Sequence, residues 1–177
     1  RFTHIRPAGL STPSLNGRSL QANPVVLPIF IEKKDLANVL PYNYKKDHPE
    51  WNFTILSVGR LESEKNFELA IRTIEIVCQK YPNTGLVIIG EGSLKKNLKS
   101  MVDFLGFSKN VLFIDGWQKN LSPFYRGADI YLQTSNYEGF GLSVVEAAYA
   151  GLPVVMTDVG AAGWLFRNGK NSMICPA

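Results

Sequence analysis

Two glutamates that stand eight positions apart, Glu138 and Glu146, carry the clearest chemical signal in the sequence. A glycine-rich turn at residues 139–141 directly follows the first glutamate, and a run of mainly apolar residues holds the second. Glycines at such a turn let a ligand approach the bare main chain. A helix beginning near Leu142 would add free amides and its positive dipole end, which together favour an anion such as a diphosphate.

The second glutamate is suited to binding hydroxyl groups. It would lie one helical turn beyond Leu142, where its carboxylate can accept hydrogen bonds from vicinal hydroxyls such as those of a ribose. Glu138 would face the other side of the same anion. Taken singly, each glutamate is equally well explained as a solvated charge or a helix-end charge. The expected helix contains Val144 and Val145 and is largely buried, so a carboxylate within it needs a partner.

Two cations, Arg60 and Lys65, straddle the turn that begins at Gly59. A guanidinium suits bidentate contact with phosphate oxygens, and an ammonium neutralises phosphate as a point charge. Each charge-assisted hydrogen bond of this kind contributes about 1.5–3 kcal/mol. The alternative is a solvated charged loop in which Lys65 pairs with Glu62 or Glu64. The two cations are therefore candidates for a second side of a diphosphate site.

The turns after the next two expected strands contribute further glycines. The segment Gly90-Glu91-Gly92-Ser93 allows a tight connection from strand to helix, with Ser93 as the expected N-cap. Gly116 exposes backbone that can meet a nucleobase edge, and Trp117 is either the wall of a base pocket or rim packing. The sequence has no cluster of His and Cys and no Asp-x-Asp pair, so we expect no metal site.

The elements that must position these residues follow a regular alternation from Trp51 onward. Candidate strands cover residues 53–58, 86–89, 111–114, 130–133, 153–156 and 171–175. Candidate helices cover residues 66–81, 94–105, 121–127 and 142–150, and Gly151 is the expected left-handed residue after the last one. The alternation predicts an α/β fold: a Rossmann-like, mostly parallel sheet with helices on both faces. Ligands bind such sheets at the carboxyl ends of the strands, where nearly all the motifs fall.

The first 50 residues lack this regularity. Residues 1–22 are rich in Ser, Pro, Gly and Asn and predict an irregular leader. Residues 25–31 form an apolar run interrupted by a proline, which indicates an edge strand or a connector. A short helix is expected over residues 34–40. Because the chain begins with Arg1 rather than Met, we expect it to be a segment of a longer protein.

Composition indicates a folded protein of one domain with some additional chain, since 45% of the 177 residues are hydrophobic. The net charge of +4 is mild and the lysines are scattered, which argues against nucleic-acid binding. No apolar run reaches the length of a membrane span, and no signal-peptide pattern occurs. Cys78 and Cys175 are expected to be separate packed thiols in a reducing compartment such as the cytoplasm.

Five motifs, in their order and spacing, resemble the C-terminal, nucleotide-sugar-binding domain of family-4 retaining glycosyltransferases, which have the GT-B fold. They are Val58-Gly59-Arg60-Leu61 with Lys65, Gly90-Glu91-Gly92, residues 111–116, Glu138-Gly139-Phe140-Gly141 with Glu146, and Thr157-Asp158-Val159-Gly160. The resemblance covers about residues 53–177. It implies that residues 51–177 are a Rossmann-like donor-binding domain without the closing C-terminal helix. Residues 1–50 would be a remnant of the N-terminal domain and the interdomain connector.

The resemblance also implies roles for individual residues. Arg60 and Lys65 would bind the donor's phosphates, Glu138 the donor sugar, and Glu146 the ribose hydroxyls. Arg60, Lys65 and Glu138 would serve in catalysis. Residues implied in nucleotide-sugar binding are Gly59, Gly92, Gly116, Trp117, Gly139, Phe140, Gly141, Leu142 and Glu146. The implied reaction is a front-face displacement without metal or cofactor, in which the departing phosphate takes the acceptor's proton and the protein stabilises charge on the leaving diphosphate.

The implied substrates are a nucleoside-diphosphate hexose donor and a glycan, lipid or other hydroxyl acceptor held by the N-terminal domain. The segment alone would be inactive, and the enzyme would be cytoplasmic, with peripheral contact to the membrane's cytoplasmic face as an option. Two alternatives remain: half of a nucleotide-sugar epimerase, or a non-catalytic nucleotide-sugar-binding subunit. Two positions depart from the family. Gly163-Trp164-Leu165 stands where members usually carry a Glu, and Thr134 replaces a common proline.

Overall fold

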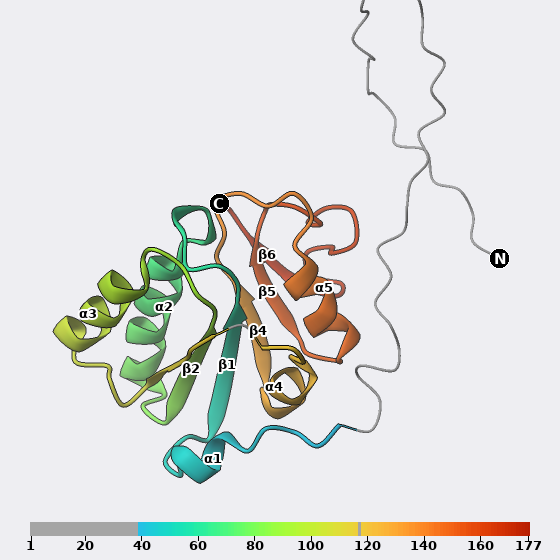
Figure 1. The fold of residues 1–177 in the computed structure, drawn as a ribbon. Coiled ribbons are helices and arrows are strands. Elements are labelled where there is room, and N and C mark those ends of the chain that lie inside the picture. Colours follow the sequence, from blue (N-terminus) through green and yellow to red (C-terminus); the bar gives the residue numbers. More distant parts are fainter. Residues whose placement is uncertain (1–38, 117) are drawn as a thin grey trace, which may run out of the picture. The chain divides into compact units, whose positions relative to one another are not determined.

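A six-stranded parallel sheet forms the centre of the computed structural model, which describes residues 39–116 and 118–177 (Figure 1). The strand order is β3-β2-β1-β4-β5-β6, so the order reverses between β1 and β4. The strands are β1 (Phe53–Val58), β2 (Thr84–Ile89), β3 (Val111–Ile114), β4 (Ile130–Gln133), β5 (Val154–Thr157) and β6 (Met173–Cys175). The predicted Rossmann-like architecture is confirmed. Such a switch point is where sheets of this kind bind ligands.

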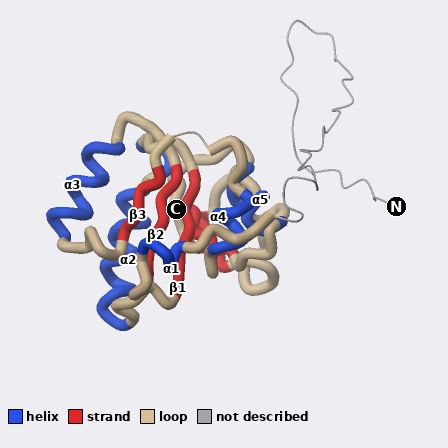
Figure 2. The backbone as a smooth tube through the Cα atoms, turned by 60° about the horizontal axis from the view of Figure 1, so that its bottom comes forward, coloured by secondary structure: helices blue, strands red, loops and turns tan. Residues whose placement is uncertain are grey.

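Helices cover both faces of the sheet, as predicted (Figures 1 and 2). The helices α2 (Phe67–Lys80) and α3 (Lys95–Leu105) pack on one face, and α4 (Ser122–Gly127) and α5 (Leu142–Tyr149) on the other. Two shorter elements complete the described part, namely α1 (Tyr44–Asp47) and the 3-10 helix η2 (Ser63–Lys65). Each face therefore has its own hydrophobic core.

Neighbouring residues of one strand supply the two cores alternately, because side chains alternate between the faces of a sheet. In β1, Ile55 packs with the α2 and α3 core, whereas Leu56 packs with the α4 and α5 core. All six residues of β2 are buried, which explains why this strand has a continuous apolar run. Burial on both faces fixes the sheet that positions the turns at its carboxyl edge.

Element boundaries differ from the predicted ones in a few places. The sixth strand begins at Met173 rather than residue 171, and β2 extends back to Thr84. Of the helix expected over residues 34–40, only Val39 and Leu40 are described, and neither is helical. The short helix in this region lies instead at Tyr44–Asp47, where buried Tyr44 donates a hydrogen bond to the Phe124 carbonyl at 3.1 Å. The strand expected over residues 25–31 lies outside the described residues.

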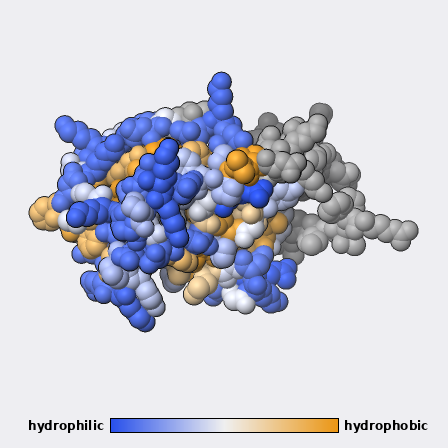
Figure 3. All heavy atoms as spheres, turned by 90° about the horizontal axis from the view of Figure 1, so that it is seen from below, coloured by the Kyte–Doolittle hydropathy of each residue, from blue (hydrophilic) through white to orange (hydrophobic). Residues whose placement is uncertain are grey.

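The side of the molecule seen from below in Figure 3 mixes hydrophilic and hydrophobic residues. An open groove of about 670 Å³ lies between α2 and the sheet. Its apolar lining includes Val77 of α2, Ile130 and Leu132 of β4, and Val155 of β5. Within the described ranges, no helix is long and apolar enough to cross a membrane.

Candidate active site

The helix α5 begins at Leu142, as predicted, directly after a glycine in the left-handed conformation. Gly141 has φ +86°, and its carbonyl accepts a hydrogen bond from the Val145 amide at 3.3 Å. The amides of the first helical turn have no partner within the helix and can bind an anion. The buried amide of Gln133 packs against this turn, and neither of its polar atoms has a hydrogen-bond partner in the described part of the chain. Gly151, at φ +90°, follows the helix in the expected left-handed conformation.

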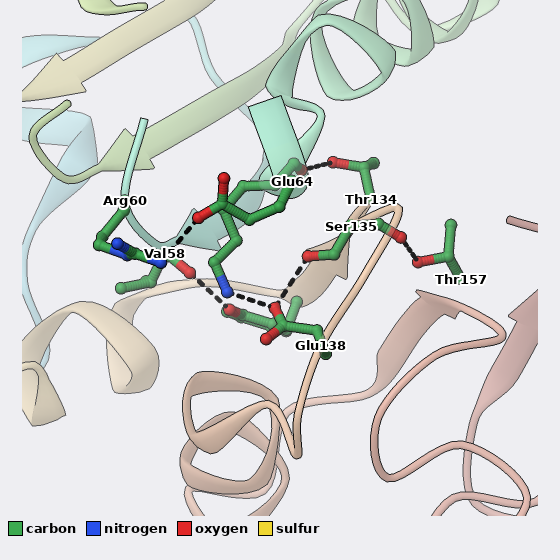
Figure 4. A network of polar contacts seen from close by, with 9 residues as sticks. Val58, Arg60, Glu64, Thr134, Ser135, Glu138 and Thr157 are labelled. Atoms are coloured by element: carbon green, nitrogen blue, oxygen red, sulfur yellow. Dashed lines mark hydrogen bonds and ion pairs between the residues drawn. The ribbon is translucent and has the colours of Figure 1, made fainter. Parts of the chain in front are cut away.

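Lys65 and Glu138 form an ion pair at the switch point (Figure 4). The Lys65 Nζ atom lies 2.6 Å from Glu138 Oε1, and the two side chains are 19% and 9% exposed. Ser135 also donates a hydrogen bond to Oε1 at 2.9 Å. The suggested pairing of Lys65 with Glu62 or Glu64 is therefore wrong, because η2 directs the ammonium across to the turn after β4. The pair links the turn after β1 to the turn after β4.

Further hydrogen bonds hold η2 against the turn after β4. The Thr134 hydroxyl donates to the Lys65 carbonyl at 3.2 Å, and the Asn136 amide donates to the Glu64 carbonyl at 2.8 Å. Behind the turn, Thr157 of β5 donates to the Ser135 carbonyl at 2.6 Å. The main chain that carries the ion pair is thus fixed by contacts from neighbouring elements.

Arg60 does not join this ion pair. Its side chain is 72% exposed, and its Nη2 atom lies 2.7 Å from Glu64 Oε1. Figure 4 shows Arg60 directed toward Glu64. In this arrangement Arg60 resembles the solvated alternative considered for the loop. Its predicted contact with phosphate can use the remaining N–H groups of the guanidinium, and exchange of this exposed pair for the ligand would also cost little.

Glu146 has a hydrogen-bond partner, although its helix is less buried than predicted: Val144 and Ala147 of α5 are buried, whereas Leu142 and Tyr149 are exposed. The hydroxyl of Tyr125 on α4 donates to Glu146 Oε2 at 3.0 Å, and Tyr125 is only 1% exposed. Burial raises the pKa of this hydroxyl well above its ordinary value, so it remains a proton donor at neutral pH. Oε1 of Glu146 has no hydrogen-bond partner among residues 39–116 and 118–177 and can accept bonds from a ligand. The sequence had not pointed to Tyr125, because a tyrosine on a short apolar helix is typical of core packing.

Glu91 accepts a hydrogen bond from Gly116, the residue whose backbone was predicted to meet a nucleobase edge. The Gly116 amide donates to Glu91 Oε1 at 2.6 Å. Lys95 lies 3.0 Å from the same carboxylate and 3.1 Å from Asp115 Oδ1. The hydrogen bond with Lys95, together with that from Gly116, lowers the pKa of Glu91. A base could use this amide only if Glu91 moved, and the predicted neighbour Trp117 lies outside the described residues.

Gly92 is required where two turns touch. A Cβ atom on Gly92 would overlap the Leu61 carbonyl oxygen, which accepts a hydrogen bond from the Leu94 amide at 2.9 Å. Gly59 lies beside the aliphatic part of Lys65, whose Cδ would be 3.5 Å from a Cβ at this position. Packing of the turns after β1 and β2 therefore requires a glycine at Gly92, whereas a Cβ at Gly59 would meet Lys65 at an ordinary contact distance.

The prediction that Ser93 caps α3 is wrong. The helix begins at Lys95 after Leu94, and the Ser93 amide and hydroxyl donate to Glu62 at 2.7 and 2.6 Å. These hydrogen bonds lower the pKa of Glu62. Ser93 therefore joins the turn after β2 to the turn after β1 instead of capping the start of α3.

The loop after β5 supports the turn that precedes α5. The Ala161 amide donates to the Phe140 carbonyl at 3.0 Å. Gly160 has φ +63°, and a Cβ there would lie 2.7 Å from the Phe140 carbonyl oxygen and 2.8 Å from Glu138 Cβ. The Trp164 ring packs edge-on against Phe140, with 5.6 Å between centroids. Trp164, at the position where the resembled family usually has a Glu, thus contacts this turn. Gly139, in the same turn, is exposed.

Taken together, the site offers an ammonium, the free amides of α5 and a carboxylate oxygen that can accept hydrogen bonds. Lys65 and Glu138 are in contact, whereas Glu146 contacts neither of them in the described structure. Within the same residues, no group of three or more His, Cys, Asp or Glu side chains is arranged to hold a metal. This set of groups suits a diphosphate that carries vicinal hydroxyls at one end.

Comparison with known proteins identifies the family. Residues 42–177 match the model of the family described as "Glycosyl transferases group 1". The chain is 33% identical over 125 residues to an uncharacterised glycosyltransferase of Methanocaldococcus jannaschii, covering 71% of this chain and 29% of that protein. It is 30% identical over 130 residues to the lipopolysaccharide core biosynthesis glycosyltransferase LpsE of Rhizobium meliloti, covering 73% and 37%. The chain thus spans about a third of the length of these relatives.

Solved structures share the fold. The C-terminal domain of a group 1 glycosyl transferase, LpcC from Francisella tularensis, has a TM-score of 0.69 and 25% identity, covering 83% of this chain and 80% of that one. The pneumococcal O-GlcNAc transferase GtfA, solved with UDP and GlcNAc, has a TM-score of 0.66 and 25% identity, covering 71% and 25%.

Proposed function

Since the chain belongs to the group 1 glycosyl transferases, we propose that residues 51–177 are the donor-binding domain of a retaining, metal-independent glycosyltransferase of family 4. The donor is a nucleoside-diphosphate hexose. The acceptor is a glycan, lipid or other hydroxyl compound held by an N-terminal domain, to which residues 1–50 connect. The observation that carries the proposal is the partly buried Lys65–Glu138 ion pair beside the free amides of α5.

In this proposal the donor diphosphate lies between Lys65 and the first turn of α5. The ammonium is paired with a single carboxylate before the donor binds, and a diphosphate competes for it with more charge. The amides at residues 142–144 add hydrogen bonds that are prearranged for the charge developing on the leaving group. Arg60 exchanges Glu64 for a phosphate oxygen at the rim.

The two glutamates bind hydroxyl groups. Oε1 of Glu138 accepts hydrogen bonds from Lys65 and Ser135, so Oε2 is the oxygen that we propose binds the donor sugar. Glu146 accepts hydrogen bonds from the ribose through Oε1. Neither acts as the base. The bond from the sugar C1 to the phosphate oxygen breaks, the acceptor oxygen bonds to C1 on the same face, and the departing phosphate takes the acceptor's proton.

UDP is the first nucleotide to test. The pneumococcal transferase GtfA was solved with UDP and GlcNAc, and a Staphylococcus aureus TarM variant, 29% identical to this chain, was solved with UDP. The base would lie near Gly116 once the Glu91 carboxylate moves away from the Gly116 amide.

We propose that the protein works in the cytoplasm, where nucleotide sugars would reach it, with peripheral membrane contact for a lipid acceptor.

The segment alone is proposed to bind donor but not to transfer sugar. The groove between α2 and the sheet, with Leu132 and Val155 in its lining, would accept the apolar side of a closing helix. The acceptor site would lie on the N-terminal domain, across a cleft from the switch point.

The experiment joins the chain to its upstream coding sequence and follows the reaction of UDP-hexoses by proton NMR. The expected result is transfer to an acceptor with the donor's anomeric configuration, unchanged by a chelator. An inverted product would contradict retention, and loss of activity with chelator would contradict metal independence. Epimerised donor without transfer would favour the epimerase alternative, and binding without any turnover would favour a non-catalytic subunit.

A further inference from the structure

The hydrogen bond between Tyr125 and Glu146 joins two elements that meet only through tertiary packing. Tyr125 lies on the six-residue helix α4, and Glu146 lies on the second turn of α5. The contact spans 21 positions of sequence and is partly buried. It is the hydrogen bond that orients the Glu146 carboxylate within the described residues.

Tyr125 itself is held in place from the side of the sheet. Its ring packs against that of Tyr131, with 6.0 Å between centroids and an interplanar angle of 56°. The Tyr131 hydroxyl in turn donates to the Val58 carbonyl at 3.2 Å, directly before the turn that carries Arg60 and Lys65. Both rings are 1% exposed, so their positions are fixed by the core. A donor hydroxyl is therefore presented to Glu146 from a rigid support.

We propose that Tyr125 is a positioning residue for ribose recognition: its hydroxyl holds Oε2 of Glu146 so that Oε1 faces the vicinal hydroxyls of the nucleotide. This inference rests on the proposed function of the same site. A glutamate side chain has several rotatable bonds, and its freedom is lost when it binds a ligand. The hydrogen bond from Tyr125 restricts that freedom in advance, which favours binding by preorganisation.

The alternative is that Tyr125 only stabilises the core. Tyr44 provides the matched control, because it is also a buried tyrosine, 3% exposed, and its hydroxyl donates to a main-chain carbonyl at 3.1 Å. Both Tyr125→Phe and Tyr44→Phe remove one buried hydroxyl and leave one acceptor unpaired. Only the first change alters a group expected to touch the ribose.

The test measures discrimination between a ribonucleotide and its 2′-deoxy form. Titration calorimetry of the 177-residue chain gives the affinity for UDP and for 2′-deoxy-UDP, or for GDP and 2′-deoxy-GDP if UDP does not bind. The wild-type chain is expected to prefer the ribonucleotide roughly tenfold, the usual effect of one hydrogen bond to a charged group. Tyr125→Phe should reduce the preference to about threefold or less, while Tyr44→Phe keeps the wild-type value.

The outcomes distinguish a failure of the proposed function from a failure of the positioning role of Tyr125. If neither UDP nor GDP binds the wild-type chain, the proposed function is overturned. If the ribonucleotide binds but Tyr125→Phe retains the full preference, only the positioning role is overturned. If Tyr125→Phe unfolds at the working temperature, the same ratio is measured in sucrose, which favours the folded state. An equal loss of preference in Tyr44→Phe would also overturn the role, because it would show a general effect of destabilisation.

Discussion

Charged groups at the carboxyl edge of the sheet occur in two settings that differ in burial. The inner pair, Lys65 and Glu138, is 19% and 9% exposed, whereas in the outer network Lys95, Glu91 and Asp115 are 25%, 49% and 55% exposed. Leaving one member of a buried pair alone costs about 3–5 kcal/mol, but exposed pairs contribute only about 0–1 kcal/mol. The inner pair is therefore a fixed part of the site, and the outer network can rearrange around a ligand.

The largest expected effect tests whether the inner pair is held by its surroundings. Gly160→Ala places a Cβ against the Phe140 carbonyl and Glu138 Cβ and strains a residue at φ +63°. We expect it to lower the free energy of unfolding by about 3 kcal/mol. Gly163→Ala is the matched control, since φ is +73° there but no atom lies within 4 Å of the added Cβ. Its cost should be about 1 kcal/mol. Equal costs in urea unfolding would contradict a tight contact with the turn before α5.

The next effect compares the inner pair with the outer network directly. Glu138→Ala leaves the Lys65 ammonium without its partner, and we expect a loss of about 2 kcal/mol in the free energy of unfolding, below the full cost because Lys65 retains some solvent contact. Glu91→Ala in the outer network should cost less, within the range of about 0–1 kcal/mol typical of exposed pairs. If Glu138→Ala cost no more than Glu91→Ala in urea unfolding, the distinction between the two settings would be wrong.

The smallest expected effect is on stability at low pH and concerns Glu62 and Glu91, in the turns after β1 and β2. Hydrogen bonds with Ser93 and Lys95 lower the pKa of Glu62 and Glu91, respectively, below the ordinary value of 4.5. A carboxyl whose pKa is lower in the folded state stabilises the fold above pH 4.5 and loses that contribution as the pH falls through its folded-state pKa. The double variant Glu62→Gln, Glu91→Gln should therefore show a flatter decline of melting temperature below pH 4.5. Glu68→Gln on the exposed side of α2 is the control, and identical slopes in all chains would refute the prediction.

The sequence predicted the order of strands and helices because each depends on local periodicity. It placed β1, β3 and β4 at their observed bounds and began α5 at Leu142. The Glu138 turn and the left-handed Gly151 follow from short-range rules of the same kind.

Long-range partners could not be predicted in this way. Tyr125 meets Glu146 across 21 positions, and Gly116 meets Glu91 across 25, through packing that no local pattern encodes. Ser93 has the chemistry of an N-cap, but Glu62 from another turn competes for it and binds both of its donors. The apolar residues of α5 did indicate that Glu146 needs a partner, although not which residue supplies it.

The central claim, that Lys65 binds a nucleotide diphosphate at the switch point, is tested most directly by titration calorimetry of UDP into the wild-type chain and two lysine variants. Lys65→Ala is expected to weaken binding at least about tenfold, or about 1.4 kcal/mol. Lys99→Ala removes a lysine that lies 3.6 Å from Asp115 in the outer network and should leave the affinity unchanged. An unchanged affinity in Lys65→Ala, or an equal loss in both variants, would contradict the account.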